Sequence, residues 1–297
     1  MASSELLLII VFFYLLKLIV TTGPLFFCEA VAITMAPPPP ENGTVGRGRT
    51  SSAVFVFGDS ILDTGNNDHI ATLIKSNFPP YGRDFPGRIP TGRFSDGRLI
   101  SDFIVESLKI KYLLPPYLDP NLRAEDLITG VCFASAFLAG QASAFLRELY
   151  RQGARKIVHL SALTTGCIPA FRTLLGGVQR QCSDESNELA VMFNEKLSDE
   201  IQRLNDDVLL PDLTVQFVDM YTPFFDIIRR PENYGFVVTK EGCCGTGTIE
   251  FGFLCNRLSP STCADNSKYI FWDSLHPTEK VYKILTSVIM KDINKLL

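Results

Sequence analysis

A short apolar run, Ala53–Phe57, constrains the fold more than any other stretch of this sequence. It is rich in β-branched and aromatic residues, which is typical of a strand buried on both faces of a parallel sheet. Gly58, Asp59 and Ser60 follow at once and are too polar for the core. Because ligands bind at the carboxyl ends of strands in open α/β sheets, the Ser60 hydroxyl is a candidate nucleophile. The alternative is an ordinary turn, since Gly, Asp and Ser are common turn residues.

Strand-like and helix-like segments alternate along the rest of the chain. Strands are expected over 129–136, 156–161 and 214–219. Helices are expected after an N-cap at Ser95, over 141–152 and 184–205, and from Pro277 onward. This alternation predicts one α/β domain with a mostly parallel sheet and helices on both faces. The 297 residues, 46% of them hydrophobic, are enough to bury such a core.

The first 52 residues are not expected to belong to this domain. Residues 6–20 form an apolar block and small residues follow at Ala30 and Ala32, which predicts a secretory signal peptide over 1–32. A retained anchor is the alternative, but the block is shorter than the ~20 residues that a spanning helix needs. Residues 33–52 are predicted to be a disordered leader with a glycosylation sequon at Asn42. We therefore expect an extracellular protein without a stable membrane span after cleavage.

Seven of the eight cysteines lie beyond the expected signal peptide. Cys132 lies in an apolar run and is predicted to be a buried free thiol. The other six lie in loop-like sequence and are expected to pair in an oxidising compartment, with the connectivity left open: Cys167, Cys182, Cys243, Cys244, Cys255 and Cys263. A zinc site is disfavoured because the clustered cysteines lack CxxC spacing and an accompanying histidine. The net charge of −4, without a basic patch, argues against nucleic acid as a partner.

One of the three histidines lies in a context that suits catalysis. His159 falls inside an expected strand and is predicted to be a core residue, whereas His69 follows a polar turn and is predicted to be solvated. His276 lies just before the last expected helix, with Asp273 three residues upstream. A serine nucleophile needs an imidazole to take its proton, and the imidazole needs a carboxylate on its other nitrogen. The alternative is that Asp273 and His276 only begin a helix, with a capping side chain.

The segments Gly58-Asp-Ser-Ile-Leu and Trp272-Asp-x-x-His-Pro together resemble the motifs of plant GDSL esterase/lipases, in the SGNH hydrolase superfamily. The resemblance is strongest to the extracellular, anther-type branch and covers residues 53–297. Further matching segments lie at 66–67, 79–85, 90–98, 130–135, 148–150, 153–156, 166–169, 234–236 and 243–247. The resemblance implies a flavodoxin-like three-layer α/β/α fold and hydrolysis of carboxylic esters without a metal or cofactor.

The resemblance also implies roles for individual residues. Ser60 would attack the acyl carbonyl, His276 would act as general base and then general acid, and Asp273 would orient the imidazole. The Ser60 backbone N–H would donate to the oxyanion, and Gly130 is a weaker candidate for the same role. The six cysteines named above would pair, and substrates would be small-molecule or lipid esters, including cell-wall or cuticle acyl esters.

The sequence departs from the family pattern at one place. A Gly-x-Asn-Asp block, whose Asn donates to the oxyanion in the family, does not occur between Ser135 and Gln141, where it belongs. Because both flanks match, we expect an internal truncation near 136–137 that removes one central strand and adjacent helices. The alternative function is therefore an impaired relative that binds lipid or ester without turning it over. Transfer of the acyl group to an alcohol also stays open, as does the oligomeric state.

Overall fold

The computed structural model describes residues 30–35, 53–134, 142–151, 153–256, 258 and 262–296. Its main sheet has the strand order β2-β1-β3-β4. These strands are β1 (Ala30–Met35), β2 (Ala53–Phe57), β3 (Lys156–Leu160) and β4 (Thr214–Val218). β3 and β4 are parallel, whereas β1 runs antiparallel to both of its neighbours. Apart from β1 the sheet is therefore parallel, as the sequence predicts.

Strand β1 lies between β2 and β3, so that the sheet has an antiparallel central strand that we do not expect. It pairs from Val31 with Phe57 to Met35 with Ala53 on one side, and from Ala30 with Leu160 on the other. On sequence alone this segment falls across the end of the signal peptide and the start of the leader, and no strand is predicted there. The backbone hydrogen bonds of β1 join β2 to β3. Without β1, the facing edges of these two strands would be unpaired.

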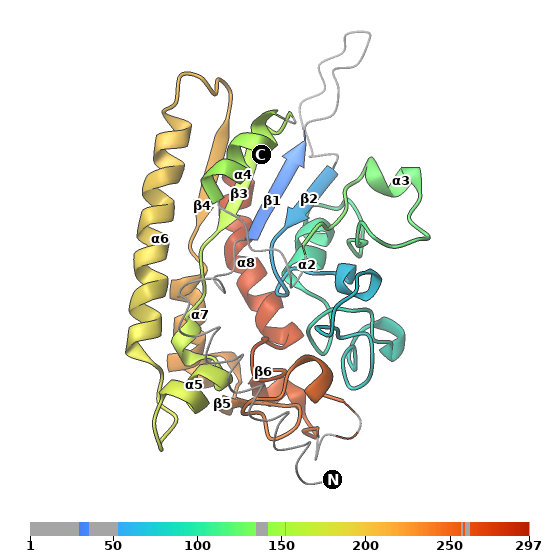
Figure 1. Cartoon of the computed structure of the whole chain (residues 1–297), viewed down its shortest axis with the longest axis vertical. Coiled ribbons are helices and arrows are strands. Elements are labelled where there is room, and N and C mark those ends of the chain that lie inside the picture. Colours follow the sequence, from blue (N-terminus) through green and yellow to red (C-terminus); the bar gives the residue numbers. More distant parts are fainter. Residues whose placement is uncertain are drawn as a thin grey trace.

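Helices cover both faces of the sheet (Figure 1), so the three-layer α/β/α architecture is confirmed. Helices α2 (Ile100–Ser107) and α8 (Glu279–Leu296) pack on one face, in a core that includes Val54, Val56 and Val158. Helices α4 (Ala142–Arg151) and α6 (Asp184–Asn205) pack on the other face, in a core that includes Ile157 and Val215. Adjacent residues Ile157 and Val158 thus point to opposite layers, as the period of a strand requires.

The remaining elements lie mostly at the carboxyl ends of the sheet strands. They are α3 (Ala124–Leu127), α5 (Pro169–Leu175), α7 (Tyr221–Arg229), β5 (Val238–Gly242) and β6 (Tyr269–Phe271). Strands β5 and β6 form a second, two-stranded parallel sheet, drawn below the main sheet in Figure 1. None of these five elements is predicted from the sequence. All six candidate cysteines pair, as Cys167–Cys182, Cys243–Cys263 and Cys244–Cys255, and Cys132 is a buried free thiol.

Helix α6 begins and ends where we predict, but the boundaries of two other helices need correction. Ser95 does not cap α2, which starts after Leu99; the Asp102 carboxylate accepts the Leu99 N–H at 3.0 Å. The last helix starts at Glu279 rather than at Pro277, because Pro277 is held extended in a bridge with Phe271.

The predicted strand at 129–136 is wrong in extent. Among its described residues only Cys132 forms a bridge, parallel to Val56 on the free edge of β2. Hydrogen bonds from the Val54 and Val56 N–H groups to the Thr129 and Val131 carbonyls hold the segment against that edge. The segment therefore extends the sheet without forming a regular strand.

Candidate active site

Ser60 lies in the turn that follows β2, at the carboxyl end of the strand. The turn is closed by hydrogen bonds from the N–H groups of Leu62 and Asp63 to the Asp59 carbonyl, at 3.1 and 3.0 Å. The Asp59 carboxylate accepts the N–H of Ile61 at 3.0 Å, which fixes the backbone on the other side of Ser60. The strand thus ends in a tight turn that leaves the half-buried Ser60 hydroxyl at its tip.

His276 and Asp273 lie in the loop between β6 and α8, and the structure brings both to Ser60. The His276 Nε2 atom is 2.8 Å from the Ser60 Oγ atom, although the residues are far apart in sequence. The Nδ1 atom is 2.9 and 2.8 Å from the two Asp273 carboxylate oxygens. The loop is closed by a 2.7 Å hydrogen bond from the Trp272 N–H to the His276 carbonyl. Both side chains are buried, so this pair is shielded from water.

An aromatic cluster surrounds the imidazole and its carboxylate. The Phe94 ring lies 5.0 Å from the His276 ring, tilted by 31°. The Tyr81 hydroxyl donates a 2.7 Å hydrogen bond to Asp273 Oδ2, and its ring meets those of Phe94 and Trp272 edge-on, each at 6.2 Å. Sequence reasoning assigns no role to Tyr81 or Phe94. The only signal was their place in the matching segments 79–85 and 90–98.

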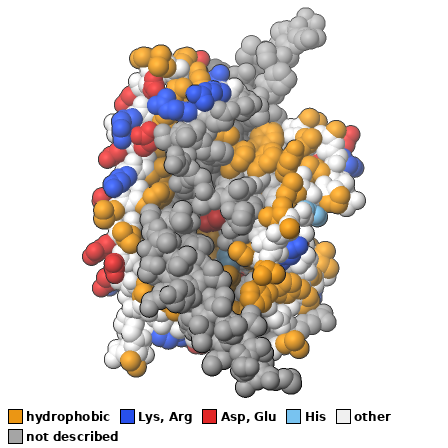
Figure 2. Space-filling model, viewed as in Figure 1, with side chains coloured by type: hydrophobic (Ala, Val, Ile, Leu, Met, Phe, Trp, Pro, Cys, Tyr) orange, Lys and Arg blue, Asp and Glu red, His pale blue; other side chains and the backbone are white. Residues whose placement is uncertain are grey.

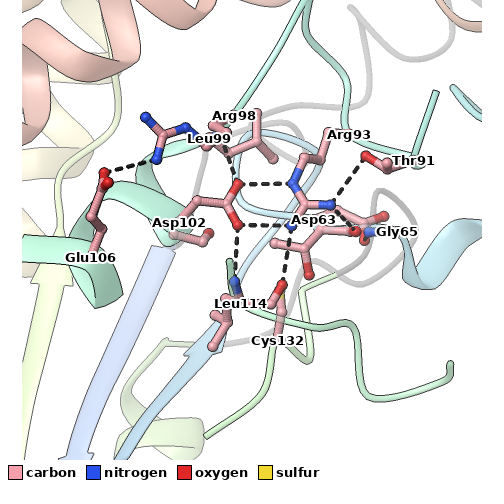
Figure 3. A network of polar contacts seen from close by, with 12 residues as sticks. Asp63, Gly65, Thr91, Arg93, Arg98, Leu99, Asp102, Glu106, Leu114 and Cys132 are labelled. Carbon is pink, nitrogen blue, oxygen red and sulfur yellow. Dashed lines mark hydrogen bonds and ion pairs between the residues drawn. The ribbon is translucent and has the colours of Figure 1, made fainter. Parts of the chain in front are cut away.

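A buried ion pair supports the Ser60 turn from behind (Figure 3). Arg93 donates from Nε and Nη2 to the Asp102 carboxylate at 2.8 and 2.7 Å, and from Nη1 to the Thr64 carbonyl at 3.0 Å. Asp102 also accepts the N–H of Leu114 at 3.0 Å. Every donor around this carboxylate is therefore used within the protein, which is the condition for a buried ion pair to be tolerated. The network ties the turn after β2 to the start of α2.

Asp63 anchors the next turn. Its carboxylate accepts the N–H groups of Gly65, Asn66 and Asn67, at 2.9, 2.7 and 3.3 Å. Burial nevertheless raises the pKa of the Asp63 carboxyl to about 7, against the opposing effect of these donors. Its hydrogen bonds go to backbone groups of its own turn, which marks it as a structural anchor.

Comparison with known proteins identifies the family to which this chain belongs. Residues 124–289 match the family model described as GDSL-like lipase/acylhydrolase. GDSL esterase/lipase At3g14820 of Arabidopsis thaliana is 40% identical over 324 residues, which takes in 84% of this chain and 92% of that protein. GDSL esterase/lipases At5g42170 and EXL3 of the same plant are 39% and 36% identical, over 81% and 80% of this chain and 85% and 86% of their own lengths. The chain belongs to the GDSL-like lipase/acylhydrolase family.

The relationship to the GDSL family also exposes a length difference. The match to At3g14820 extends over 324 residues, more than the 297 that this chain contains in total. Residues of that relative therefore have no counterpart here. The match does not locate these residues along the chain, so the internal truncation near 136–137 stays a prediction.

One residue named for the oxyanion site does not fit that role in this GDSL protein. Gly130 donates its N–H to the Leu127 carbonyl at 3.2 Å and lies against the backbone of Val54. It is thus at the opposite end of β2 from Ser60, and its donor is already used. The weak expectation that Gly130 donates to the oxyanion, which rested on the family resemblance alone, is therefore wrong.

The side-chain amides of the two asparagines near Ser60 also donate their hydrogen bonds to other groups. Asn66 donates to the carbonyls of Cys132 and Ala134, both at 2.8 Å, and Asn67 donates to that of Ile74 at 2.9 Å. Within the described part of the chain, no hydrogen bond from the Ser60 N–H to another backbone group is found.

The predicted exposure of His69 and burial of His159 agree with the structure. His69 is exposed, and His159 is buried in β3, where burial lowers the pKa of its imidazole to about 4. Asn42 lies outside the described residues. In the described ranges no group of His, Cys, Asp and Glu side chains could hold a metal ion, and no helix is long and apolar enough to cross a membrane.

Proposed function

We propose that this protein is a secreted serine hydrolase that cleaves carboxylic esters with Ser60, His276 and Asp273. The observation that carries the proposal is the continuous hydrogen-bonded line from Ser60 Oγ through the imidazole to the carboxylate, with 2.8 Å at each step. The names of the relatives, GDSL esterase/lipases, support the reaction class. The three disulfides support an oxidising, extracellular compartment.

Ser60, His276 and Asp273 each have a separate role in the proposed reaction. His276 takes the Ser60 proton on Nε2 while Oγ attacks the ester carbonyl, and the imidazolium then gives that proton to the departing alcohol. Water attacks the acyl-serine in the second half, with the same imidazole as base. Asp273 holds the ring with Nδ1 protonated, so that Nε2 faces the hydroxyl, and stabilises the imidazolium.

We expect this chain to stabilise the oxyanion of the reaction only weakly. Loss of a single oxyanion donor costs about 10²–10³ in turnover. With the Gly-x-Asn-Asp block lost and the Gly130 donor used, the Ser60 N–H is the donor that remains from the roles we assigned. We therefore infer a slow enzyme with an assembled nucleophile.

An apolar surface beside Ser60 supports an acyl or lipid ester as the substrate. The Phe133 ring stacks on Phe57 at 5.0 Å and meets Tyr117 at 4.5 Å, and Phe57 ends the strand that carries Ser60. Figure 2 shows hydrophobic side chains gathered over the α3 region. Leu127 and Ile128 of that region lie toward the amino end of β2, whereas the exposed Tyr117 and Leu118 lie toward the Ser60 end, next to Phe133 and Asn66.

The second candidate is a binding protein that does not turn its ester over. The used Gly130 donor and the lack of a Gly-x-Asn-Asp block between Ser135 and Gln141 favour it, because binding needs the apolar surface but not the oxyanion site. Acyl transfer to an alcohol shares every step up to the acyl-serine and differs only in the acceptor.

Labelling with a fluorophosphonate tests the proposal, since this reagent reacts with an activated serine hydroxyl. We expect covalent labelling of the secreted protein that is lost in Ser60→Ala and in His276→Ala. The matched control is His69→Ala, an exposed histidine whose loss should leave labelling unchanged. Absence of labelling in a cooperatively folded sample would refute the hydrolase proposal in favour of the binding protein.

A further inference from the structure

The Tyr81 hydroxyl contacts the candidate triad without belonging to it. Tyr81 lies in the segment 79–85, one of those that resemble the family, and it has no role in the proposed mechanism. Its side chain is 1% exposed, and its hydroxyl lies 2.7 Å from Asp273 Oδ2. The interaction spans 192 residues of sequence, so it depends on the folded structure.

The direction of this hydrogen bond is fixed by the groups on both sides of the phenol. The Gly252 N–H donates to the phenol oxygen at 2.8 Å, so the phenol proton points to the carboxylate. Burial first, and then the Asp273 charge, raise the pKa of the Tyr81 phenol well above its ordinary value, so it keeps this proton at any working pH.

Asp273 thus has donors on both oxygens. Oδ1 accepts the N–H groups of Leu275 and His276 at 2.8 and 2.7 Å, and these bonds belong to the loop itself. Tyr81 is the donor to Oδ2 from outside the loop. The other hydrogen-bond and ring contacts of the imidazole among the described residues are to Ser60 and Phe94, neither of which is charged. Asp273 and its donors therefore set the local electrostatics of His276.

We infer that Tyr81 is a positioning residue that sets the basicity of His276 through Asp273. This inference rests on the proposed function, in which His276 is the general base. A hydrogen bond to a carboxylate withdraws part of its charge, and the carboxylate then stabilises the imidazolium less. Without the Tyr81 hydroxyl, Oδ1 stays anchored by the two backbone donors, while Oδ2 carries more charge toward Nδ1. The imidazolium becomes more stable, so a smaller fraction of His276 is in the neutral form that can accept a proton at neutral pH.

The direct test is titration of the histidine rings by NMR in Tyr81→Phe. With three histidines in the chain, His276 is assigned by its absence in His276→Ala. We expect the titration midpoint of His276 to rise by about one pH unit in Tyr81→Phe. The matched control is Tyr234→Phe, which removes a hydroxyl that also donates to an aspartate at 2.7 Å, to Asp226, away from the site. An unchanged or lowered midpoint in Tyr81→Phe would overturn the inference.

A second measurement links this shift to reactivity. The rate of fluorophosphonate labelling in Tyr81→Phe should fall several-fold below neutral pH and recover at alkaline pH, with the rate in Tyr234→Phe unchanged. A rate reduced equally at all pH values would mean that Tyr81 has only a structural role. Failure of the wild-type protein to label would refute the proposed function alone, because the NMR titration still decides the Tyr81–Asp273–His276 coupling.

If Tyr81→Phe does not fold, replacement of Tyr81 by 3-fluorotyrosine keeps the hydroxyl and makes it a stronger donor. The His276 midpoint should then move down, opposite to the shift expected from loss of the hydroxyl. A midpoint equal to that of the wild-type protein would again overturn the inference.

Discussion

The two halves of the candidate site are held in different ways. Asp273 and His276 lie beside two disulfides, Cys243–Cys263 and Cys244–Cys255, in a region where the aromatic cluster and local backbone donors fix both side chains. Ser60 instead follows β2, whose neighbour in the sheet is the antiparallel β1. The acid–base half is thus held by its own loop and by nearby disulfides, whereas the nucleophile half depends on the pairing of β2 within the main sheet.

Removal of the Asp273 charge should have the largest effect of any change in the acid–base half. We expect Asp273→Asn to lower kcat/KM or the fluorophosphonate labelling rate by about 10⁴, because the amide favours the wrong imidazole tautomer. The control is Asp226→Asn, which also loses a tyrosine partner but lies elsewhere. Equal rates in the two variants would show that Asp273 does not act on His276.

Restoration of the predicted missing stretch should repair the oxyanion site. Insertion, between residues 136 and 137, of the segment that a relative such as At3g14820 carries should raise turnover of a short-chain ester by about 10²–10³ for each donor regained. The same insertion with the Asn of its Gly-x-Asn-Asp block changed to Ala is the control. If both insertions leave turnover unchanged, the weak oxyanion site is not the limit.

Strand β1 offers a smaller test of the sheet. Thr34 pairs with Val54 on one side and Lys156 on the other, so Thr34→Pro should cost a ladder hydrogen bond, about 1–3 kcal/mol of unfolding free energy. Thr34→Val, which suits a strand, is the control, and both are measured by denaturant unfolding. Equal stability of the two variants would mean that the secreted protein no longer contains β1, and mass spectrometry of its N-terminus would then locate the cleavage.

His159, which lies next to β1 in the sheet, provides a test that depends on pH. Its imidazole pKa is lowered to about 4 in the folded state, from 6.5. The unfolded chain therefore binds the extra proton first, and stability falls as pH drops from 6.5 toward 4, by up to about 3 kcal/mol. His159→Gln should flatten this part of the stability profile, whereas His69→Gln, at an exposed residue, should not. Identical slopes in the two variants would contradict the burial of a neutral His159.

Local patterns predict much of this fold. The predicted bounds of helix α6 agree with the structure, because its apolar stripe follows the helical period and Ser183 caps its first turn. The proximity of Asp273 and His276 is also local, since three residues in one loop separate them. In contrast, the strand at 129–136 is overestimated, because an apolar run does not reveal how many of its residues find a partner.

Two features that sequence patterns do not reveal depend on contacts between residues far apart in the sequence. Tyr81 lies in a Pro- and Gly-rich loop without periodicity, and it meets Asp273 only after the chain has folded. The role of β1 is hidden for a similar reason. Its small and apolar residues fit a signal-peptide boundary equally well, and it becomes a strand because β2 and β3 leave a place between them.

The position of β1 has a consequence for the order in which the sheet can form. Its pairing with β2 joins Met35 to Ala53 and needs only a modest loop, whereas its pairing with β3 joins Ala30 to Leu160. During synthesis one edge of β1 therefore stays open until β3 has left the ribosome. Long-range pairings of this kind fold slowly, and an open strand edge is a template for pairing with other chains. Yield of the secreted protein should thus depend on how quickly β3 reaches that edge.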